Sequence, residues 1–165
     1  MTNSSVHPAS FRDPSGFLFK RDGYLYRQVN LSYQKEYDLL MSSGLYEDLV
    51  EKRMLVRHTE VDVKPEQPGQ AYKVLKPELV ETISYPYEWS FSQLKDAALR
   101  TLAIQKRALK KGMILKDASA YNIQFQDARP VLIDSLSFGI YHPGEAWVAY
   151  KQFCQHFLAP LALMA

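Results

Sequence analysis

One stretch of acids and an amide in the second half of the chain constrains its fold more than any other feature. Asp117 is followed five residues later by Asn122, and two β-prone runs, Ile123–Phe125 and Val131–Ile133, come next with a short turn between them. Asp134 follows the second run directly. A hairpin folds its second strand back along its first, and so returns Asp134 to the neighbourhood of Asn122. The sequence therefore predicts that a carboxylate and an amide from opposite ends of this hairpin lie close together.

This layout resembles the catalytic loop and metal-binding segment of protein kinases and aminoglycoside-phosphotransferase-like enzymes. The resemblance implies that Asp117 is the catalytic residue that orients an attacking hydroxyl. It also implies that Asn122 and Asp134 hold Mg²⁺ against the phosphates of ATP or GTP. The residues alone leave a second interpretation open, because Asp and Asn also close turns by bonding to their own backbone.

The order of the predicted elements agrees with that resemblance. A hairpin is predicted over Gly16–Val29, with a helix after it that starts at Ser32 as N-cap, and then strands up to about residue 84. A connector, Ser84–Trp89, leads into a long helix over Ser90–Lys111. The implied fold class is α+β and protein-kinase-like, with a small antiparallel-sheet lobe and a truncated helical lobe.

Three parts are expected along the chain. Residues 1–15 are predicted to be a flexible arm, residues 16–84 the small strand-rich lobe, and residues 85–165 the helical lobe, with a last helix from about residue 145. One strand is expected over residues 54–63, and two more within residues 71–84. The final residues are apolar and few residues follow Asp134, so the helical lobe is expected to be cut short at the C-terminus.

Four residues are candidates for holding the nucleotide. Arg27 shares a strand face with aliphatic residues and needs an acidic partner if that face is covered. Glu36 in the next helix could supply it, and the resemblance implies that such a pair holds nucleotide phosphates. A solvated Arg27 at a sheet edge is the alternative. The connector resembles a kinase hinge, whose backbone at Tyr85 and Tyr87 would face an adenine ring.

Several features depart from a working kinase. No G-x-G-x-x-G loop is present, Leu115 stands where a histidine is usual, and Ser135 and Leu136 follow Asp134 in place of Phe-Gly. These departures favour a degenerate nucleotide and magnesium site over an active phosphotransferase.

A second resemblance covers most of the chain from residue 84 onward. Ser84–Phe91, Leu115–Asn122 and Trp147–Leu161 are similar to the N-terminal region of longer bacterial SAM-dependent methyltransferases, some of them related to a nodulation protein. The resemblance implies that a methyltransferase domain follows this chain and alone binds SAM. The seven glycines include no G-x-G, which a dinucleotide-type cofactor turn needs, so this chain is not expected to bind SAM.

Composition excludes several classes of function. The chain is 47% hydrophobic and 23% charged, which is typical of a soluble globular protein, and its net charge of +2 gives no reason to expect nucleic acid as a partner. No apolar run is long enough for a membrane span. A single cysteine, Cys154, excludes an internal disulfide and is expected to be an inert thiol in the cytoplasm. The four histidines lack metal-ligand spacing, and Ser119 has no glycine elbow and no histidine near it in the sequence.

Two functions therefore remain from the sequence. The preferred one is an accessory module that positions a substrate or partner for a downstream methyltransferase. The apolar C-terminal segment would then be covered by that domain or by another protein surface. The other is an active small-molecule phosphotransferase that uses Asp117, Asn122 and Asp134. In both, Trp89 and Phe91 are expected to be buried where the connector meets the long helix.

Overall fold

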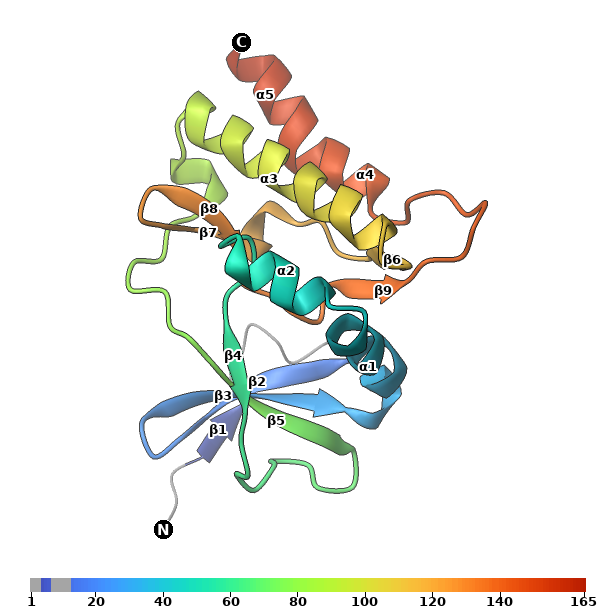
Figure 1. Cartoon of the computed structure of the whole chain (residues 1–165). Helices are drawn as coiled ribbons and strands as arrows, with labels where there is room; N and C mark the ends of the chain where they lie inside the picture. Colours follow the sequence, from blue (N-terminus) through green and yellow to red (C-terminus); the bar gives the residue numbers. More distant parts are fainter. Residues whose placement is uncertain (1–3, 7–12) are drawn as a thin grey trace. The chain divides into compact units, whose positions relative to one another are not determined.

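A computed structural model describes residues 4–6 and 13–165 of the chain. The chain divides into two compact units, one formed by Met1–Asp38 and Arg57–Leu79 and the other by Leu39–Val56 and Val80–Ala165 (Figure 1). The sequence-based division assigned all of residues 16–84 to one lobe, whereas residues 80–84 and the segment Leu39–Val56 belong to the second unit. That segment joins the second unit because its apolar side chains, Leu40, Leu45 and Leu49 among them, are fully buried in the core of that unit.

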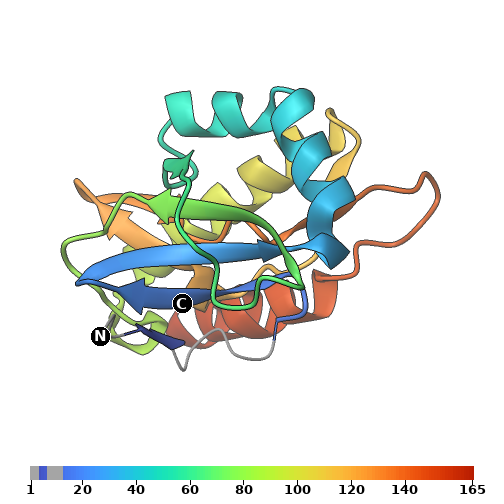
Figure 2. The ribbon, with the colours of Figure 1, turned by 90° about the horizontal axis from the view of Figure 1, so that it is seen from below.

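The first unit is built on one antiparallel sheet with the strand order β1-β2-β3-β5-β4. Figure 2 shows β2, β3 and β5 side by side in this sheet. The strands are β1 (Ser4–Val6), β2 (Gly16–Arg21), β3 (Tyr24–Asn30), β4 (His58–Glu60) and β5 (Ala71–Pro77). The predicted hairpin over residues 16–29 is confirmed. Its turn residues Asp22 and Gly23 have φ angles of 50° and 83°, as a tight two-residue hairpin turn requires.

The first unit differs from the sequence predictions in four places. Ser4–Val6 forms an edge strand where a flexible arm was expected, while the arm prediction for residues 1–3 and 7–12 lies outside the described residues. Only three residues within 54–63 form a strand. One strand, not two, occurs within 71–84, and it ends at Pro77, which has no N–H for the ladder. The Ser32 hydroxyl donates to the Pro14 carbonyl (2.7 Å) and does not cap a helix.

Ser32 lies inside a short 3₁₀ turn and not at the N-cap of a helix. The turn is η2 (Leu31–Tyr33), and it leads into α1 (Gln34–Ser42), which the two units share between them. The small core of the first unit contains Phe17, Phe19 and Val74.

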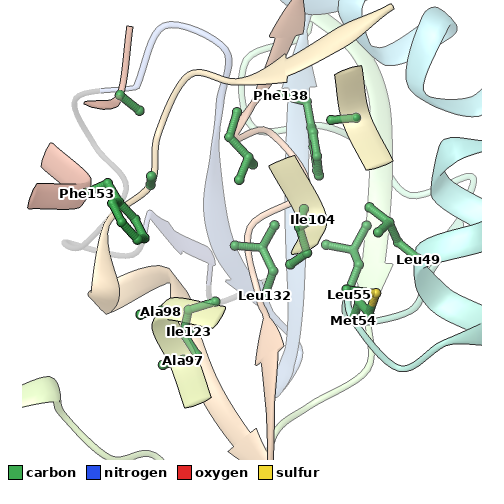
Figure 3. Packing of buried hydrophobic residues seen from close by; sticks show 14 of the residues in the cluster. Leu49, Met54, Leu55, Ala97, Ala98, Ile104, Ile123, Leu132, Phe138 and Phe153 are labelled. Atoms are coloured by element: carbon green, nitrogen blue, oxygen red, sulfur yellow. The ribbon is translucent and has the colours of Figure 1, made fainter. Parts of the chain in front are cut away.

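The second unit contains helices and two short two-stranded ladders. Its elements are α2 (Leu45–Glu51), η3 (Pro86–Glu88), α3 (Phe91–Leu109), β6 (Met113–Leu115), η4 (Ala120–Asn122), β7 (Ile123–Gln126), β8 (Arg129–Leu132), β9 (Phe138–Ile140), α4 (Tyr150–Phe153), η5 (Cys154–Leu158) and α5 (Ala159–Met164). Strand β6 pairs with β9, and β7 pairs with β8. One core joins these elements, and Figure 3 shows Ile104, Leu132 and Phe138 within it.

The long helix α3 confirms the prediction for residues 90–111. The Ser90 hydroxyl accepts the Gln93 N–H, and the Gln93 side chain accepts the Ser90 N–H, which is a capping box. Gly112, with a φ of 73°, ends the helix region in the left-handed conformation. Trp89 is 5% exposed, as predicted. Phe91 is 38% exposed, so the prediction of its burial was wrong, because the first turn of α3 directs its side chain toward solvent.

The last helical segment runs from Tyr150 to Met164 and starts later than the predicted residue 145. Its middle part, η5, is a π-helix that ends two residues before Pro160, which has no N–H for an α-helical bond. Phe153 and Phe157 anchor the segment to the core. None of the helices in the described part of the chain is both long and apolar enough to cross a membrane.

Candidate catalytic-loop site

The backbone of the loop between β6 and β7 is fixed by the segment that precedes β9. The N–H groups of Lys116 and Asp117 both donate to the Ser137 carbonyl, at 2.8 and 3.4 Å. The Ser119 hydroxyl then accepts the Tyr121 N–H and caps η4. Asp117 lies two residues after β6, and Asn122 is the last residue of η4, directly before β7.

Asp117 is held from two directions through one of its oxygens. Its Oδ1 accepts the Ser119 N–H (3.0 Å) and the Gln152 Nε2–H (2.8 Å). The Gln152 Oε1 in turn accepts the Ala118 N–H (2.7 Å). The side-chain amide of Gln152 on α4 therefore hydrogen-bonds both to the Asp117 carboxylate and to the backbone beside it. The Asp117 carboxylate is therefore oriented through Oδ1, and its Oδ2 has no hydrogen-bond partner among the described residues.

Asn122 and Asp134 meet at the hydroxyl of Ser137. The Asn122 Nδ2–H donates to Ser137 Oγ (3.3 Å), and Ser137 O–H donates to Asp134 Oδ2 (3.0 Å). The Ile133 N–H also donates to the Asn122 carbonyl (2.8 Å). The two predicted metal-binding side chains therefore lie well within the roughly 10 Å beyond which they could not share one Mg²⁺.

Both acids also take part in ordinary turn chemistry. Asp117 Oδ1 accepts the N–H two residues ahead, and Asp134 Oδ1 likewise accepts the Leu136 N–H (3.0 Å). The geometry therefore shows the turn interpretation directly, while Mg²⁺ binding by Asn122 and Asp134 stays a prediction. The donor set of one amide oxygen and one carboxylate suits Mg²⁺, which prefers oxygen ligands and keeps several waters or phosphate oxygens. The described residues contain no group of three or more His, Cys, Asp or Glu side chains able to hold a metal ion.

The connector is fastened to the hairpin beneath it. The buried Gln124 side chain accepts the Ser84 N–H (2.9 Å) and donates to the Ser84 carbonyl (3.0 Å). The Trp89 indole N–H donates to the Ser84 hydroxyl (2.9 Å), and the ring lies edge-on against Phe125, with centroids 5.2 Å apart. The connector is therefore rigidly placed on β7.

The two connector tyrosines are exposed and stack on each other, with ring centroids 5.4 Å apart and planes at 5°. Reduced hydration raises the pKa of Tyr87, and the nearby Glu88 carboxylate raises it further. The Tyr85 N–H donates to Glu88 Oε2 (2.7 Å), and the Tyr85 carbonyl accepts the Glu88 N–H (2.8 Å). The backbone donor at Tyr85 is thus engaged inside the connector.

Arg27 and Glu36 both belong to the first unit. Arg27 lies opposite Leu18 and Leu75 in the ladder of its sheet. Glu36 is half-buried in the first turn of α1. The role of Arg27 and Glu36 as a pair that holds nucleotide phosphates stays a prediction.

Three residues of the site could not be found by sequence reasoning, namely Ser137, Gln152 and His156. His156 Nδ1 accepts the Ala120 N–H (3.2 Å) and lies 3.2 Å from Ser119 Oγ. Folding therefore places beside Ser119 the histidine that its sequence neighbourhood lacks. A nitrogen that accepts an N–H carries no proton of its own, so the Ser119 hydroxyl donates to it. The one sequence signal was the spacing of Gln152 and His156, which are four residues apart in a helix.

The fold and the loop define the structural class as protein-kinase-like. The structure of vaccinia related kinase 3 matches 90% of this chain and 52% of its own, with a TM-score of 0.51 and 15% sequence identity. This confirms the predicted fold class, an α+β kinase-like fold with an antiparallel sheet and helices.

A curated sequence relative gives a more particular likeness. The chain is 40% identical over 156 residues to the nodulation protein NoeA of Rhizobium meliloti (strain 1021). The alignment covers 93% of this chain and 32% of that protein, so the chain spans about a third of the length of its relative. No family model matches the chain.

Proposed function

We propose that this chain is a kinase-like accessory module of a longer NoeA-like protein, and that it positions a substrate or partner. The segment that carries Asp117, Asn122 and Asp134 is called the acid-and-amide loop. In this proposal it is a degenerate nucleotide and magnesium site. The observation that carries the proposal is the internal use of the polar groups of the site. Ser137 bridges Asn122 and Asp134, and Asp117 Oδ1 holds its own loop and Gln152.

Two further features support the accessory role. The Tyr85 N–H, which a hinge would offer to an adenine ring, is bonded to Glu88. No G-x-G-x-x-G run exists anywhere in the sequence to cover nucleotide phosphates. Both features remove contacts that a nucleotide would make, so they weaken its expected binding to this chain.

A phosphotransferase is the second candidate, and the partner-free Oδ2 of Asp117 favours it. An oriented carboxylate with one available oxygen can accept the proton of an attacking hydroxyl. Asn122 and Asp134 would hold Mg²⁺, which would neutralise charge on the phosphates of ATP or GTP. Arg27, Tyr85 and Tyr87 remain the candidate nucleotide contacts of this alternative.

A thermal-shift titration with millimolar Mg-ATP or Mg-GTP decides between the two candidates. A ligand that binds only the folded state stabilises it by about 2.7 kcal/mol at a hundred times Kd. We expect no rise in the melting temperature. Asp134→Asn tests the site, and Asp127→Asn removes the same charge at the exposed turn of the same hairpin as a control. A rise lost in Asp134→Asn and kept in Asp127→Asn would establish the phosphotransferase candidate.

We also propose that the remainder of the longer protein is a SAM-dependent methyltransferase in the bacterial cytoplasm. The sequence resemblance of residues 84–161 to such proteins supports this. That region, or another protein surface, would cover the exposed apolar side chains Leu158, Leu163 and Met164. Isothermal titration of this chain with SAM should give no binding heat. Saturable binding of SAM to residues 1–165 would contradict the assignment of SAM to another domain.

A further inference from the structure

A groove of about 430 Å³ in the second unit is lined by residues of α3 and of the β7–β8 hairpin. It is lined by Asp96, Leu99, Arg100, Ala103, Ala128, Arg129 and Pro130. None of these residues belongs to the acid-and-amide loop or to the connector. The volume falls within the range of sites that hold small organic molecules.

Two guanidinium groups converge on this groove from different elements. Arg100 comes from the middle of α3, and Arg129 comes from the first position of β8. Neither forms an ion pair among the described residues, whereas the neighbouring Arg107 is paired with Asp48 at 2.8 Å. Asp96 lies one helical turn before Arg100 and gives the lining a net charge of +1. The groove thus combines two cations with no paired anion.

The direction of the pKa shift of Arg100 indicates that its positive charge lacks a compensating anion. Burial lowers the pKa of Arg100, and the positive charges of Arg129 and Arg107 lower it further, against the opposing effect of Asp96. An anion placed between Arg100 and Arg129 would relieve this repulsion. Guanidinium groups bind carboxylates and phosphates through paired N–H donors, so two of them can surround one oxyanion.

The rest of the lining is apolar. Leu99 is exposed on α3, and Ala103 and Pro130 continue the apolar wall beside it. A small inorganic anion would leave this wall in water, whereas an anion with an apolar body would cover it. Asp96 would accept a hydroxyl or N–H of such a ligand and would disfavour a second anionic group at its end of the groove.

We infer that this groove binds a small organic anion, a carboxylate or phosphate with an apolar body attached. The inference does not depend on the proposed function, because it uses none of the residues of the acid-and-amide loop. Arg100 and Arg129 hold the anionic group, and Leu99, Ala103 and Pro130 contact the apolar part.

Phenyl phosphate and benzoate are suitable probes, followed by chemical shifts in ¹H–¹⁵N NMR spectra of the whole chain. Saturable shifts at α3 and the β7–β8 turn are expected, while phenol, which lacks the anion, should bind at least about tenfold more weakly. Tighter binding of phenyl phosphate than of benzoate would assign a phosphate ligand, and the reverse would assign a carboxylate. Inorganic phosphate, without an apolar body, should bind more weakly than phenyl phosphate.

Charge-removing variants locate the site. Arg100→Gln and Arg129→Gln should each weaken binding of the preferred probe by about tenfold. Lys106→Gln removes the same charge from an exposed position of α3 outside the groove and should leave the affinity unchanged. The inference is overturned if neither probe shifts these resonances, if phenol binds equally well, or if both arginine variants bind like the wild type. Two separate arginine variants guard against one of them failing to fold.

Discussion

The described part of each unit contains a hydrogen-bonded polar network, and the two networks are held together by different kinds of bond. In the first unit, Tyr37 O–H donates to Glu60 (3.0 Å), Lys73 pairs with the same carboxylate (2.7 Å), and His58 Nε2 lies 3.3 Å from the Tyr37 oxygen. In the second unit, Asp117, Asn122 and Asp134 bond mainly to backbone groups and to Ser137.

The difference shows that burial and polarity alone do not define a site. The network of the first unit matches each charge with an opposite charge or a hydrogen bond, and its stability should follow the titration of its side chains. The network of the second unit anchors the backbone and leaves the Oδ2 of Asp117 without a described partner. The bonds that Asn122 and Asp134 make with Ser137 are the reason that the ligand affinity of the second network is expected to be low.

The largest expected effect concerns Trp89, the buried tryptophan of the connector in the second unit. Trp89→Ala should lower the free energy of unfolding by about 3–5 kcal/mol, because it removes a buried ring packed against Phe125. Phe91→Ala, at a position that is 38% exposed, should cost clearly less. Urea denaturation of both variants measures the difference. Equal losses would show that Phe91 also lies in the core.

The pH dependence of the first network should be the next largest effect. Burial, followed by the charge of Arg27, lowers the pKa of His58 from 6.5 to about 4. Between these pH values His58 binds a proton in the unfolded chain but not in the folded chain. The contribution of His58 to stability is therefore fully present above pH 6.5 and is lost as the pH falls toward 4. The loss from this group is on the order of 3 kcal/mol at most.

Melting temperatures of the wild type and of His58→Gln across this pH range test that expectation. The variant should show a flatter pH profile from 6.5 down to about 4. The pairing with Lys73 lowers the pKa of Glu60 below 4.5, so this carboxylate loses its contribution mainly under the His58 range. Parallel profiles for the two proteins would contradict the neutral, buried state of His58.

A smaller effect is expected at the fastening of the connector. Gln124→Leu would leave the Ser84 N–H and carbonyl without their side-chain partner and should cost about 1–3 kcal/mol. Gln126→Leu, on the exposed end of the same strand, is the matched control. Hydrogen exchange at Ser84 should quicken in the first variant alone. Unchanged exchange there would mean that Gln124 does not hold the connector.

Local signals made much of the second unit predictable. Ser90 and Gln93 form a capping box and Gly112 provides a stop, so α3 could be located from sequence alone. The hairpin between Asn122 and Asp134 was equally local, because its strands and turn are contiguous. Such features need no knowledge of distant contacts.

Tertiary contacts explain what the sequence could not supply. Ser137, Gln152 and His156 reach the loop from later segments, and none of them carries a motif of its own. The membership of Leu39–Val56 in the second unit depends on which core receives its leucines, and periodicity does not encode that choice. The exposure of Phe91 depends likewise on the direction of one helical turn.

The central claim is that the acid-and-amide loop serves mainly to hold its own structure. The most direct measurement is the free energy of unfolding of Asp134→Ala without ligand, with Glu145→Ala at an exposed loop position as control. Loss of the acceptor for the Ser137 hydroxyl and the Leu136 N–H should lower it by about 1–3 kcal/mol, and the control should change little. An unchanged or increased free energy of unfolding in Asp134→Ala would contradict the account, since it would indicate a carboxylate kept at the expense of stability for chemistry.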